Sequence, residues 1–545
     1  MPIPALAFRL ALLAASFLAP FPAPAGAAPA QSGPGLPSWS YRIVGQASGY
    51  VVFIADKETD GVFELFRAEL DGSGTTKLSP PLAPGGRVRE AWIAPDGQSV
   101  AFRADVSVPF VDEFWVAAAD GSGATRVSPP LVPNGAFLFL QSEPWSPDSQ
   151  WLAFGARATT PGVMDLYAVR PDGTQLRNLS SIQNPFGDVS FGWAWSPDSS
   201  RVAFIADAVV DNTHQLYSSP PTGPTVLVDG PSPSELDRDV RSFLWSPDGQ
   251  RIAYTATFPF PGGTWLRTAS PTGQGMIDIA SDLPSGGAAA PAGAPDGSRI
   301  AWIGQHATPG VLEAFTALPN GGARVRVSGS MVNGGDVRAI RWAPTSDRIL
   351  YRADQETNNR EELYVSPAAT GGGSVKINGP LSSNGAIDLS EWYWSPDGAY
   401  VAYAARQNTR PELWVSAADG STNVAVNGPL PSWGRATLFG DPWAPDGSRL
   451  AYAGVQLSFN VQEIFTVRPD GSDLQRVSPA PPASGRSASV GPLWTGDSAR
   501  VVLRGNFVEP TRRELFAARA DGSAAPAICG AFVPGGSVDE TYWVR

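Results

Sequence analysis

The sequence is poor in the residues that most often carry catalysis or cross-links. Among 545 residues there are two histidines and one cysteine. The single Cys529 excludes an internal disulfide, so the fold must be stabilised by its core. The apolar Ala-Ile-Cys-Gly context of this cysteine favours a buried small hydrophobe over a nucleophile. His214 and His306 lie about ninety residues apart without metal-ligand spacing, which predicts ordinary surface or loop residues.

Two further absences narrow the function. No Gly-x-Ser-x-Gly elbow occurs, and the repeats described below leave no room for a hydrolase domain, so peptidase chemistry is not expected. The 39 Lys and Arg against 51 Asp and Glu give a net charge of −12, and no stripe of basic residues is present. This acidity argues against nucleic acid and anionic membranes as partners.

The first thirty residues predict a cleaved export signal. Arg9 is the only charge there, the apolar run Leu10–Leu18 follows, and the triplets ending at Ala27 and Ala30 both fit a cleavage site. A membrane anchor is the alternative, but the run is far shorter than the ~20 residues needed to span a bilayer. No cysteine follows for a lipid anchor. We therefore expect a signal peptide over 1–30, a linker over 31–42, no membrane insertion, and a periplasmic or secreted protein.

What the sequence does contain is one phrase repeated every 48 to 52 residues: Trp-Ser-Pro-Asp-Gly or a near variant, followed by a short alternating strand. A period of this size indicates a repeat architecture. The aligned first positions are Ile93, Trp145, Trp195, Trp245, Gly293, Trp342, Trp394, Trp443, Trp494 and Trp543.

The unit from 245 to 291 shows the expected strands. Residues 243–245 predict one strand, and Ser-Pro-Asp-Gly after it is a β-turn in which the Asp bonds to nearby backbone. Residues 251–255, 264–267 and 276–279 predict three more strands, the last two joined by a hairpin at Thr272-Gly273. Glycine recurs at this hairpin in all ten units, as a tight turn with positive φ requires. Four antiparallel strands per unit, without a convincing helix, predict the blade of a β-propeller.

These motifs resemble the propeller repeat of the TolB family. Trp-Ser-Pro-Asp-Gly, a strand such as Arg-Val-Ala-Phe, then Glu-Leu-Tyr-Val and Asp-Gly-Ser carry the resemblance, which covers about 43 to 545. The same repeat occurs in the non-catalytic domains of prolyl-oligopeptidase-type peptidases. The chain departs from TolB in having no room for an N-terminal α/β domain, and its ten units exceed the usual six or seven.

The ends of the repeat region suggest how the ring closes. Residues 541–545 match the first strand of a unit and then stop, while the first unit begins at its second strand, 50–54. A C-terminal strand that completes the N-terminal blade would close one all-β ring of about ten four-stranded antiparallel blades over 43–545. Residues 41–44 could instead serve as the inner strand of the first blade, with two smaller propellers as the alternative. The weakest unit lies around Gly293, after the glycine- and alanine-rich run 286–290, where a domain junction would be sought.

Candidate binding residues come from the innermost strands, just before each turn, where a channel mouth is expected. Glutamates occupy the position three residues before the aligned Trp in some units, and arginines stand one residue earlier in three units, one of which also has the glutamate. The candidates are Arg89, Glu90, Glu143, Arg241, Arg338, Glu391, Asp441 and Glu540. Glu90 and Glu540 would lie on adjacent blades and could bind a cation or share a proton, although two solvated acids are the simpler interpretation. The arginines could neutralise them or contact an acidic partner.

The function that these observations favour is binding rather than catalysis. The acidic loops 56–60 and 354–356 could hold Ca²⁺, but solvated loops are favoured, and no metal or cofactor is predicted. The resemblance to TolB implies an exported, non-enzymatic monomer that recognises a protein or peptide in the cell envelope at one propeller face. The alternative is a carbohydrate-binding or carbohydrate-active propeller that uses the mouth carboxylates and exposed aromatics such as Trp433. A propeller that presents substrate to a separate hydrolase is a third hypothesis. Convergence of Glu90, Glu391 and Glu540 within ~5–10 Å would favour the enzyme.

Overall fold

The computed structural model describes residues 49–544, apart from 132–136, 139–141, 159, 161, 181–186, 211, 231–238, 259–262, 284–290, 383–384, 408–409, 481–490 and 510. The expected signal peptide and linker therefore lie outside the described residues, as does the candidate inner strand 41–44. No helix in the described part of the chain is long and apolar enough to cross a membrane.

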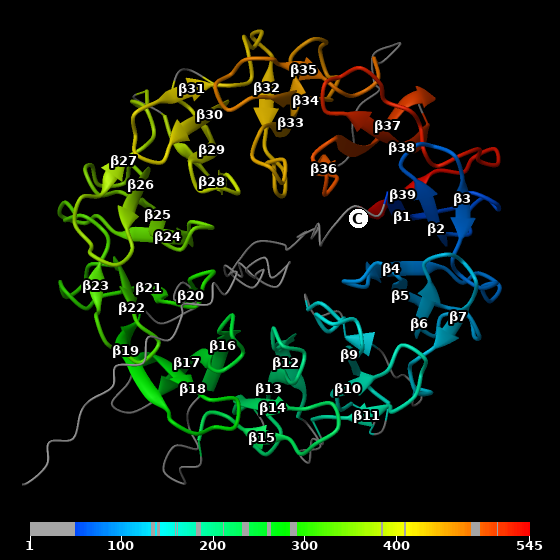
Figure 1. Cartoon of the computed structure of the whole chain (residues 1–545), viewed down its shortest axis with the longest axis horizontal. Coiled ribbons are helices and arrows are strands. Elements are labelled where there is room, and N and C mark those ends of the chain that lie inside the picture. The colour runs from blue at the N-terminus through cyan, green and yellow to red at the C-terminus, as the bar shows by residue number, and fades with distance from the viewer. Residues whose placement is uncertain are drawn as a thin grey trace, which may run out of the picture.

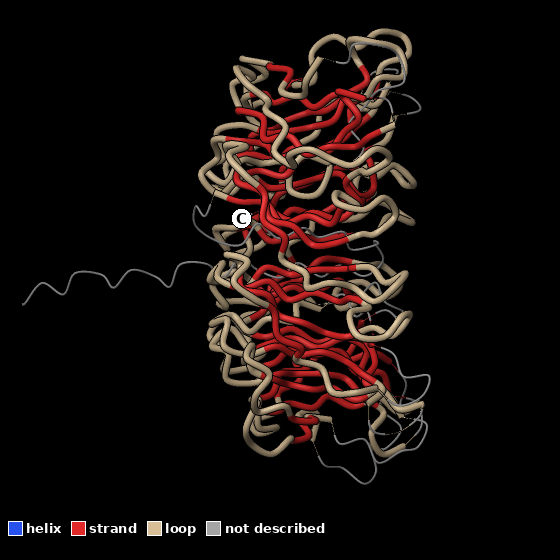
Figure 2. The backbone as a smooth tube through the Cα atoms, turned by 90° about the vertical axis from the view of Figure 1, so that its right-hand side faces the viewer, coloured by secondary structure: helices blue, strands red, loops and turns tan. Residues whose placement is uncertain are grey.

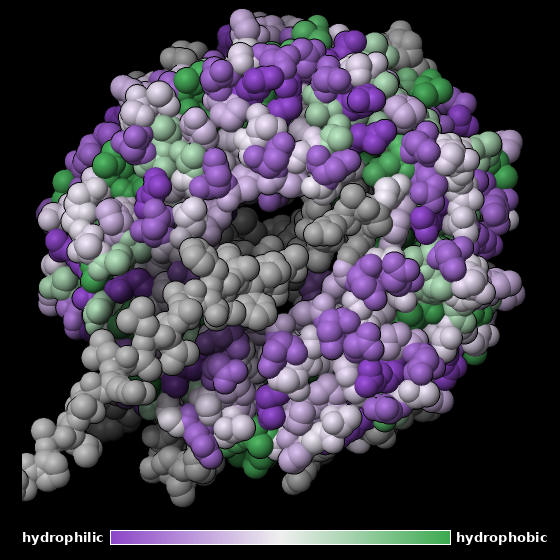
Figure 3. Space-filling model, in the orientation of Figure 1, coloured by the Kyte–Doolittle hydropathy of each residue, from purple (hydrophilic) through white to green (hydrophobic). Residues whose placement is uncertain are grey.

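Ten small antiparallel sheets form one ring around a central opening (Figures 1 and 3). Seen from the edge, the strands cross the thickness of the ring and the loops project from both faces (Figure 2). This is a ten-bladed β-propeller. We number the blades in chain order, so that blade 1 contains β1 to β3, blade 2 contains β4 to β7, and blade 10 contains β36 to β38.

Each blade begins with a strand next to the central opening and continues outward. The innermost strands are β4 (Val88–Ile93), β8 (Phe137–Leu138), β12 (Val189–Trp195), β16 (Asp239–Trp245), β20 (Ala292–Gly293), β24 (Val337–Trp342), β28 (Ile387–Trp394), β32 (Arg435–Thr437), β36 (Leu493–Trp494) and β39 (Val538–Val544). The second strands are β1 (Tyr50–Ala55), β5 (Ser99–Ala104), β9 (Leu152–Ala156), β13 (Val202–Ala206), β17 (Ile252–Phe258), β21 (Ile300–Gly304), β25 (Arg348–Ala353), β29 (Tyr400–Ala405), β33 (Leu450–Val455) and β37 (Arg500–Glu509).

Two outer strands complete the blade. The third strands are β2 (Glu64–Glu69), β6 (Glu113–Ala118), β10 (Asp165–Val169), β14 (Gln215–Ser219), β18 (Gly263–Ala269), β22 (Glu313–Ala317), β26 (Glu362–Pro367), β30 (Glu412–Ala417), β34 (Glu463–Val467) and β38 (Arg512–Arg519). The fourth strands are β3 (Thr75–Lys77), β7 (Ala124–Arg126), β11 (Arg177–Asn178), β15 (Val226–Leu227), β19 (Ile277–Leu283), β23 (Val325–Arg326), β27 (Val375–Lys376), β31 (Asn423–Ala425) and β35 (Gln475–Arg476).

The C-terminal strand closes the ring. β39 pairs antiparallel with β1, with Val51 opposite Val544 and Phe53 opposite Tyr542, so blade 1 has the order β3-β2-β1-β39. The predicted closure is confirmed, and the alternative of two smaller propellers is wrong because all ten sheets belong to one ring. Blade 10 departs from four full strands: its fourth position is a single bridge between Phe516 and Ala527.

The tryptophan that begins most of the repeated phrases links its blade to the preceding one. The indole N–H of Trp494 donates to the carbonyl of Pro442 in the preceding blade at 2.9 Å. The same bond to the preceding inner strand is made by Trp145, Trp195, Trp245, Trp342 and Trp443. Each buried bond of this kind contributes about 1 kcal/mol, so the tryptophans hold the blades together in series.

The turn after each tryptophan also links blades. In blade 5, Asp248 accepts hydrogen bonds from the Ser246 hydroxyl (2.6 Å) and the Gln250 N–H (3.0 Å), which is the local turn role predicted for this Asp. Some units have serine where Gly closes the turn, and Ser149 keeps the left-handed φ of 62°. Its hydroxyl accepts the N–H of Asp96 in the preceding blade at 2.9 Å. Ser199, Ser346 and Ser498 make the same contact.

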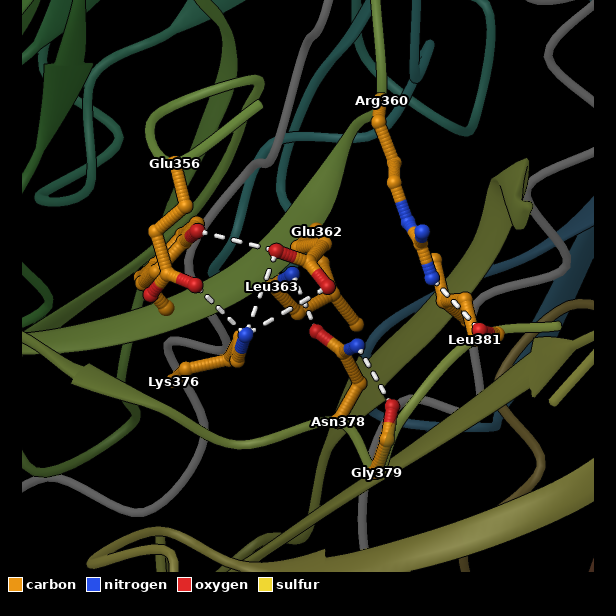
Figure 4. A network of polar contacts seen from close by, with 9 residues as sticks. Glu356, Arg360, Glu362, Leu363, Lys376, Asn378, Gly379 and Leu381 are labelled. Atoms are coloured by element: carbon orange, nitrogen blue, oxygen red, sulfur yellow. Dashed lines mark hydrogen bonds and ion pairs between the residues drawn. The ribbon is translucent and has the colours of Figure 1, made fainter. Parts of the chain in front are cut away.

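The carboxylate that opens many third strands is structural. Glu362 and the more exposed Glu356 both pair with Lys376 on the fourth strand (Figure 4), at 3.4 and 2.6 Å. Asn378, just beyond, accepts the N–H of Leu363 at 2.8 Å. Comparable glutamate pairs to the fourth strand occur at Glu64, Glu113, Glu313 and Glu463. These contacts fasten the outermost strand, so the repeated glutamates are not available to a ligand.

The apolar core lies between neighbouring blades. One cluster, for instance, joins Val52 and Leu65 of blade 1 to Val100 and Phe102 of blade 2, all fully buried. The unit that has Gly293 in place of tryptophan continues this pattern, because Leu244 of blade 5 approaches Gly293 where a larger side chain would stand. The run 286–290 falls outside the described residues, but β20 keeps its place in the ring.

Candidate functional site

One face of the ring carries the loops that join the second and third strands together with the connections between blades. We call it the loop face; the Ser-Pro-Asp-Gly turns and the outer hairpins lie at the opposite face. In blade 2, Val88 pairs with Ala104, so the start of the inner strand lies beside the end of the second strand. The predicted Arg89, Arg241 and Arg338 therefore stand at the loop face, where each inner strand begins.

In blade 2 the predicted residues belong to an ion cluster. Arg89 pairs with Asp105 and Asp112, both at 2.8 Å, and Arg103 also pairs with Asp112 at 2.8 Å. Glu90 lies opposite Arg103 in the register of the sheet. Burial raises the pKa of Glu90, and the nearby Arg103 partly offsets this. Arg89 thus neutralises two aspartates of its own blade rather than Glu90.

The other predicted arginines are also paired locally. Arg241 forms an ion pair with Asp239 on the same strand, and Arg338 pairs with Asp336 at 3.4 Å. About half of the Arg241 side chain is exposed, and somewhat less of Arg338. Each remains accessible to an anionic partner.

The predicted glutamates do not form one site. Figure 1 places β4, which carries Glu90, and β28, which carries Glu391, on opposite sides of the central opening. Glu143 is exposed in the segment before Trp145, in blade 3. Glu540 lies in β39, on the blade next to Glu90 as expected, but its side chain lies outside the described residues. Glu90 and Glu391 cannot act together on one glycosidic bond.

The structure does assemble a cluster around Glu391. Its carboxylate accepts the N–H of Leu438 in blade 9 at 2.8 Å. Burial raises the pKa of Glu391 to about 7, and the nearby Asp388 adds to this, while the Leu438 N–H opposes it. A carboxyl group with this pKa is partly protonated at neutral pH, so it can both donate and accept a hydrogen bond.

Tyr393 lies at the centre of this cluster. Burial raises its pKa, Arg341 opposes the shift, and the carboxylates of Glu391, Asp441 and Asp388 reinforce it, so all four charged groups lie within electrostatic reach of its hydroxyl. Asp441, also predicted, is exposed just before Trp443. We call Arg341, Asp388, Glu391, Tyr393 and Asp441 the blade 8 cluster; it is built from β24, from β28 and from the segment between β32 and Trp443.

Arg341 is its unusual member. The guanidinium lies over the ring of Trp392 at 4.1 Å and near that of Tyr393 at 5.2 Å. It also donates to the carbonyl of Trp392 across the blade boundary. Burial lowers its pKa to about 10, so it stays charged at neutral pH. The cluster offers one fixed cation, a partly protonated carboxyl group and two further acids, a mixture suited to binding polar groups.

Sequence reasoning found Glu391 and Asp441 but missed the other three members of this cluster. Arg341 occupies the place before the aligned Trp, where other units have Trp92, Ala194 or Leu244. A charge at a position that is apolar elsewhere was the available signal. Asp388 and Tyr393 carry no such signal, because polar and aromatic residues are common on inner strands.

The remaining candidates have structural surroundings. His214 of blade 4 contacts Asp239 of blade 5 at 2.9 Å, and His306 lies edge to face against Phe315 of its own blade. Cys529 is buried, and burial raises its pKa to about 12, as expected of a core residue.

The acidic loops also bond to backbone. Asp56 accepts the N–H of Ser537 at 2.6 Å and that of Gly61 at 3.1 Å. Asp354 makes the equivalent bonds to the N–H groups of Asp336 and Asn359. In the part of the chain that the structure describes, no group of three or more His, Cys, Asp or Glu residues is placed to hold a metal ion. That no cofactor is required stays a prediction.

Comparisons with known proteins give only distant likenesses among solved structures. No protein-family model matches the chain, and no curated protein matches it. Among solved structures it is similar to TolB from Acinetobacter baumannii, at 14% sequence identity and a TM-score of 0.26, over 51% of this chain and 63% of that one. It is also similar to dipeptidyl peptidase 4 from Porphyromonas gingivalis (11%, TM-score 0.45, over 73% and 62%) and to an oligogalacturonate lyase from Vibrio parahaemolyticus (13%, TM-score 0.35, over 70% and 96%). Likenesses this distant carry no argument about activity.

Proposed function

We propose that this propeller is a non-enzymatic binding protein that recognises a protein or peptide partner at its loop face. The observation that carries the proposal is the placement of its exposed apolar side chains. Eleven large hydrophobic residues are exposed in the described part of the chain, and nine of them stand in loop-face segments. The nine are Val108, Phe110, Val111, Val209, Val210, Trp433, Leu457, Phe459 and Val508, whereas Leu176 and Val375 lie by the outer hairpins.

An uneven distribution of this kind favours a partner. Single exposed hydrophobics are ordinary on any protein, but their gathering on one face, with aromatics among them, is typical of interaction surfaces. The face of the molecule drawn in Figure 3 is largely hydrophilic, with apolar residues scattered in it. The blade 8 cluster lies along the inner strands, with Asp388 near the loop face and Arg341 and Tyr393 near the turns of the opposite face, so it is separate from this apolar loop-face surface.

The wider setting belongs to the same proposal. The expected signal peptide supports export to the periplasm or beyond, and the resemblance of the repeat to TolB supports a partner in the cell envelope. Closure of the ring by the chain's own C-terminal strand supports a monomer. Because β39 already pairs with the inner edge of β1, that edge does not need a strand from a second copy.

Carbohydrate binding is the second candidate. Glu391, with a pKa near 7, lies close to Tyr393 and to the acids Asp388 and Asp441. Acids beside an aromatic hydroxyl can hydrogen-bond sugar hydroxyl groups, and Trp433 is exposed in the connection that leads to β32. Glu90 and Glu391 lie on opposite sides of the opening, so these two carboxylates do not form the pair that hydrolysis of a glycosidic bond uses.

The test is capture of a partner from a native envelope extract by the chain starting at Gln31. A loop-face variant carrying Phe110→Ser, Val210→Ser and Phe459→Ser is compared with a control carrying Leu176→Ser and Val375→Ser at the opposite face. We expect a stoichiometric protein that the control retains and the loop-face variant loses. Equal capture by both variants, or capture of no protein while a glycan array gives a ligand, would refute the proposal.

A further inference from the structure

A small part of the loop face differs from the rest of this acidic protein. It lies across blades 8 and 9 and consists of Arg406, Arg410, Trp433, Arg435, Leu457 and Phe459, which we call the basic aromatic patch. The rings of Trp433 and Phe459 meet edge to face with centroids 5.8 Å apart. Phe459 is 61% exposed and Leu457 56%, so the apolar surface is open to solvent.

Three connections build the patch, and they come together at one boundary. Residues 406–411 join β29 to β30, 428–434 lead from blade 8 into β32 of blade 9, and 456–462 join β33 to β34. The Arg410 guanidinium donates to the carbonyls of Leu430 and Pro431, at 3.2 and 2.6 Å, and so fixes the second connection against the first. The Trp433–Phe459 contact joins the second to the third.

The patch is basic, whereas the chain as a whole is acidic. Asp and Glu outnumber Lys and Arg by 51 to 39 overall, yet residues 406–411, 428–437 and 456–462 contain three arginines and no acid. Arg406 and Arg435 are exposed, and neither forms an ion pair among the described residues. Arginines elsewhere on this face, such as Arg89 and Arg241, are paired with aspartates. Two accessible cations thus stand on the linked segments that carry the exposed aromatic pair.

We propose that the basic aromatic patch docks an acidic peptide segment of the partner. An aromatic or branched aliphatic side chain of that segment packs on Trp433 and Phe459, and Asp or Glu residues beside it pair with Arg406 and Arg435. Trp and Arg are the residues that most often dominate binding energy at interfaces. Guanidinium groups bind carboxylates through two parallel hydrogen bonds, which sets the register of the segment. The inference rests on the proposed function and adds to it the chemistry of the partner.

The exposed arginines also distinguish an acidic peptide from other possible occupants of the patch. A saccharide would stack on Trp433 without requiring Arg406 or Arg435. A second copy of this acidic chain could present carboxylates to the patch, in which case the protein would self-associate. An acidic segment of a different protein requires both the aromatics and the arginines, and long-range attraction to the arginines would make its association sensitive to salt.

The experiment selects peptides from a random displayed library on the intact chain and measures the affinity of synthetic versions by calorimetry. We expect the selected peptides to combine Asp or Glu with an aromatic or aliphatic residue. Trp433→Ser with Phe459→Ser should weaken them roughly tenfold to a hundredfold. Arg406→Glu with Arg435→Glu should weaken them at least about tenfold, and added salt should weaken wild-type binding.

Matched controls come from the opposite face. Leu176→Ser replaces an exposed hydrophobe there, and Arg468→Glu reverses an exposed arginine paired with Asp473. Both should bind the peptides as the wild type does, and circular dichroism should show that every variant is folded. The inference would be overturned by selected peptides that lack acids or by patch variants that bind the peptides as the wild type does. It would also be overturned by a glycan ligand at Trp433 or by self-association that Trp433→Ser abolishes. Capture from the envelope extract separates the two proposals when a Phe110→Ser, Val210→Ser variant is compared with Phe459→Ser alone. A partner lost only with Phe110 and Val210 would keep the proposed function while this patch failed.

Discussion

Replacing Glu391 by Gln should remove a pH-dependent loss of stability that the fold imposes. The pKa of Glu391 is raised from 4.5 to about 7, chiefly by burial. Below pH 4.5 both the folded and the unfolded chain keep the proton, so the shift has no effect. As the pH rises toward 7, the unfolded chain loses the proton first, and the free energy of unfolding falls; above pH 7 the loss is constant.

The magnitude follows from the pKa. A change from 4.5 to about 7 at about 1.4 kcal/mol per pKa unit amounts to about 3 kcal/mol. A glutamine at this position still accepts the Leu438 N–H but carries no proton to lose. The Glu391→Gln variant should therefore match the wild type near pH 4.5 and exceed it by up to about 3 kcal/mol at pH 8. For a chain of this length that corresponds to about 3 °C in the melting temperature.

The assay is thermal unfolding of both proteins at several pH values between 4.5 and 8. Glu356→Gln serves as the control, since this carboxylate is half exposed and its replacement also removes one negative charge from the chain. The reasoning is refuted if Glu391→Gln follows the wild-type pH profile throughout. It is equally refuted if Glu356→Gln produces the same gain at pH 8.

Four other outcomes are expected. Trp494→Phe, which loses an inter-blade hydrogen bond, should cost about 1–3 kcal/mol more in chemical denaturation than Trp394→Phe, whose indole N–H has no acceptor among the described residues. Phe110 has a φ of 61° at a loop position where other blades have Gly or Asn. Phe110→Asn should therefore increase the free energy of unfolding by about 0.5–1 kcal/mol and raise the melting temperature. Removing Val538–Val544 should expose the edge of β1 and produce oligomers in light scattering; a stable monomer would contradict the closure argument. Cys529 should resist a thiol reagent at pH 8 until the chain is unfolded, and rapid labelling of the native protein would contradict its burial.

The repeat made the fold predictable because the same local pattern occurs ten times. Each Ser-Pro-Asp-Gly turn and each glycine hairpin positions two strands, and the order of strands within a blade follows directly. Closure was also predictable, since residues 541–545 match a strand that blade 1 lacks. The role of Ser149 and its equivalents at the turn was not predictable, because the serine hydroxyl bonds to another blade and no local sequence pattern indicates that contact.

The candidate site was predictable only in part. Position within the unit located Glu90 and Glu391 correctly on inner strands, but it could not say that they face different neighbours. Arg103 stands opposite one of them, whereas the other meets Leu438, Tyr393 and Asp388. Leu438 comes from the adjacent blade, 47 residues away, and the residues around the inner strands vary from unit to unit. The repeated residues therefore predict the propeller, whereas the chemistry of the candidate site depends on residues that differ from one unit to the next.

The pairing of β39 with β1 also has a consequence for biosynthesis. The first strand of the propeller leaves the ribosome almost five hundred residues before its partner, which at ordinary translation rates is about 25 to 100 seconds. During that time the nascent chain has an unpaired strand edge that can recruit other chains or bind a chaperone. A cell that makes this protein must therefore protect blade 1 until synthesis ends, and any premature termination yields a product that cannot mature.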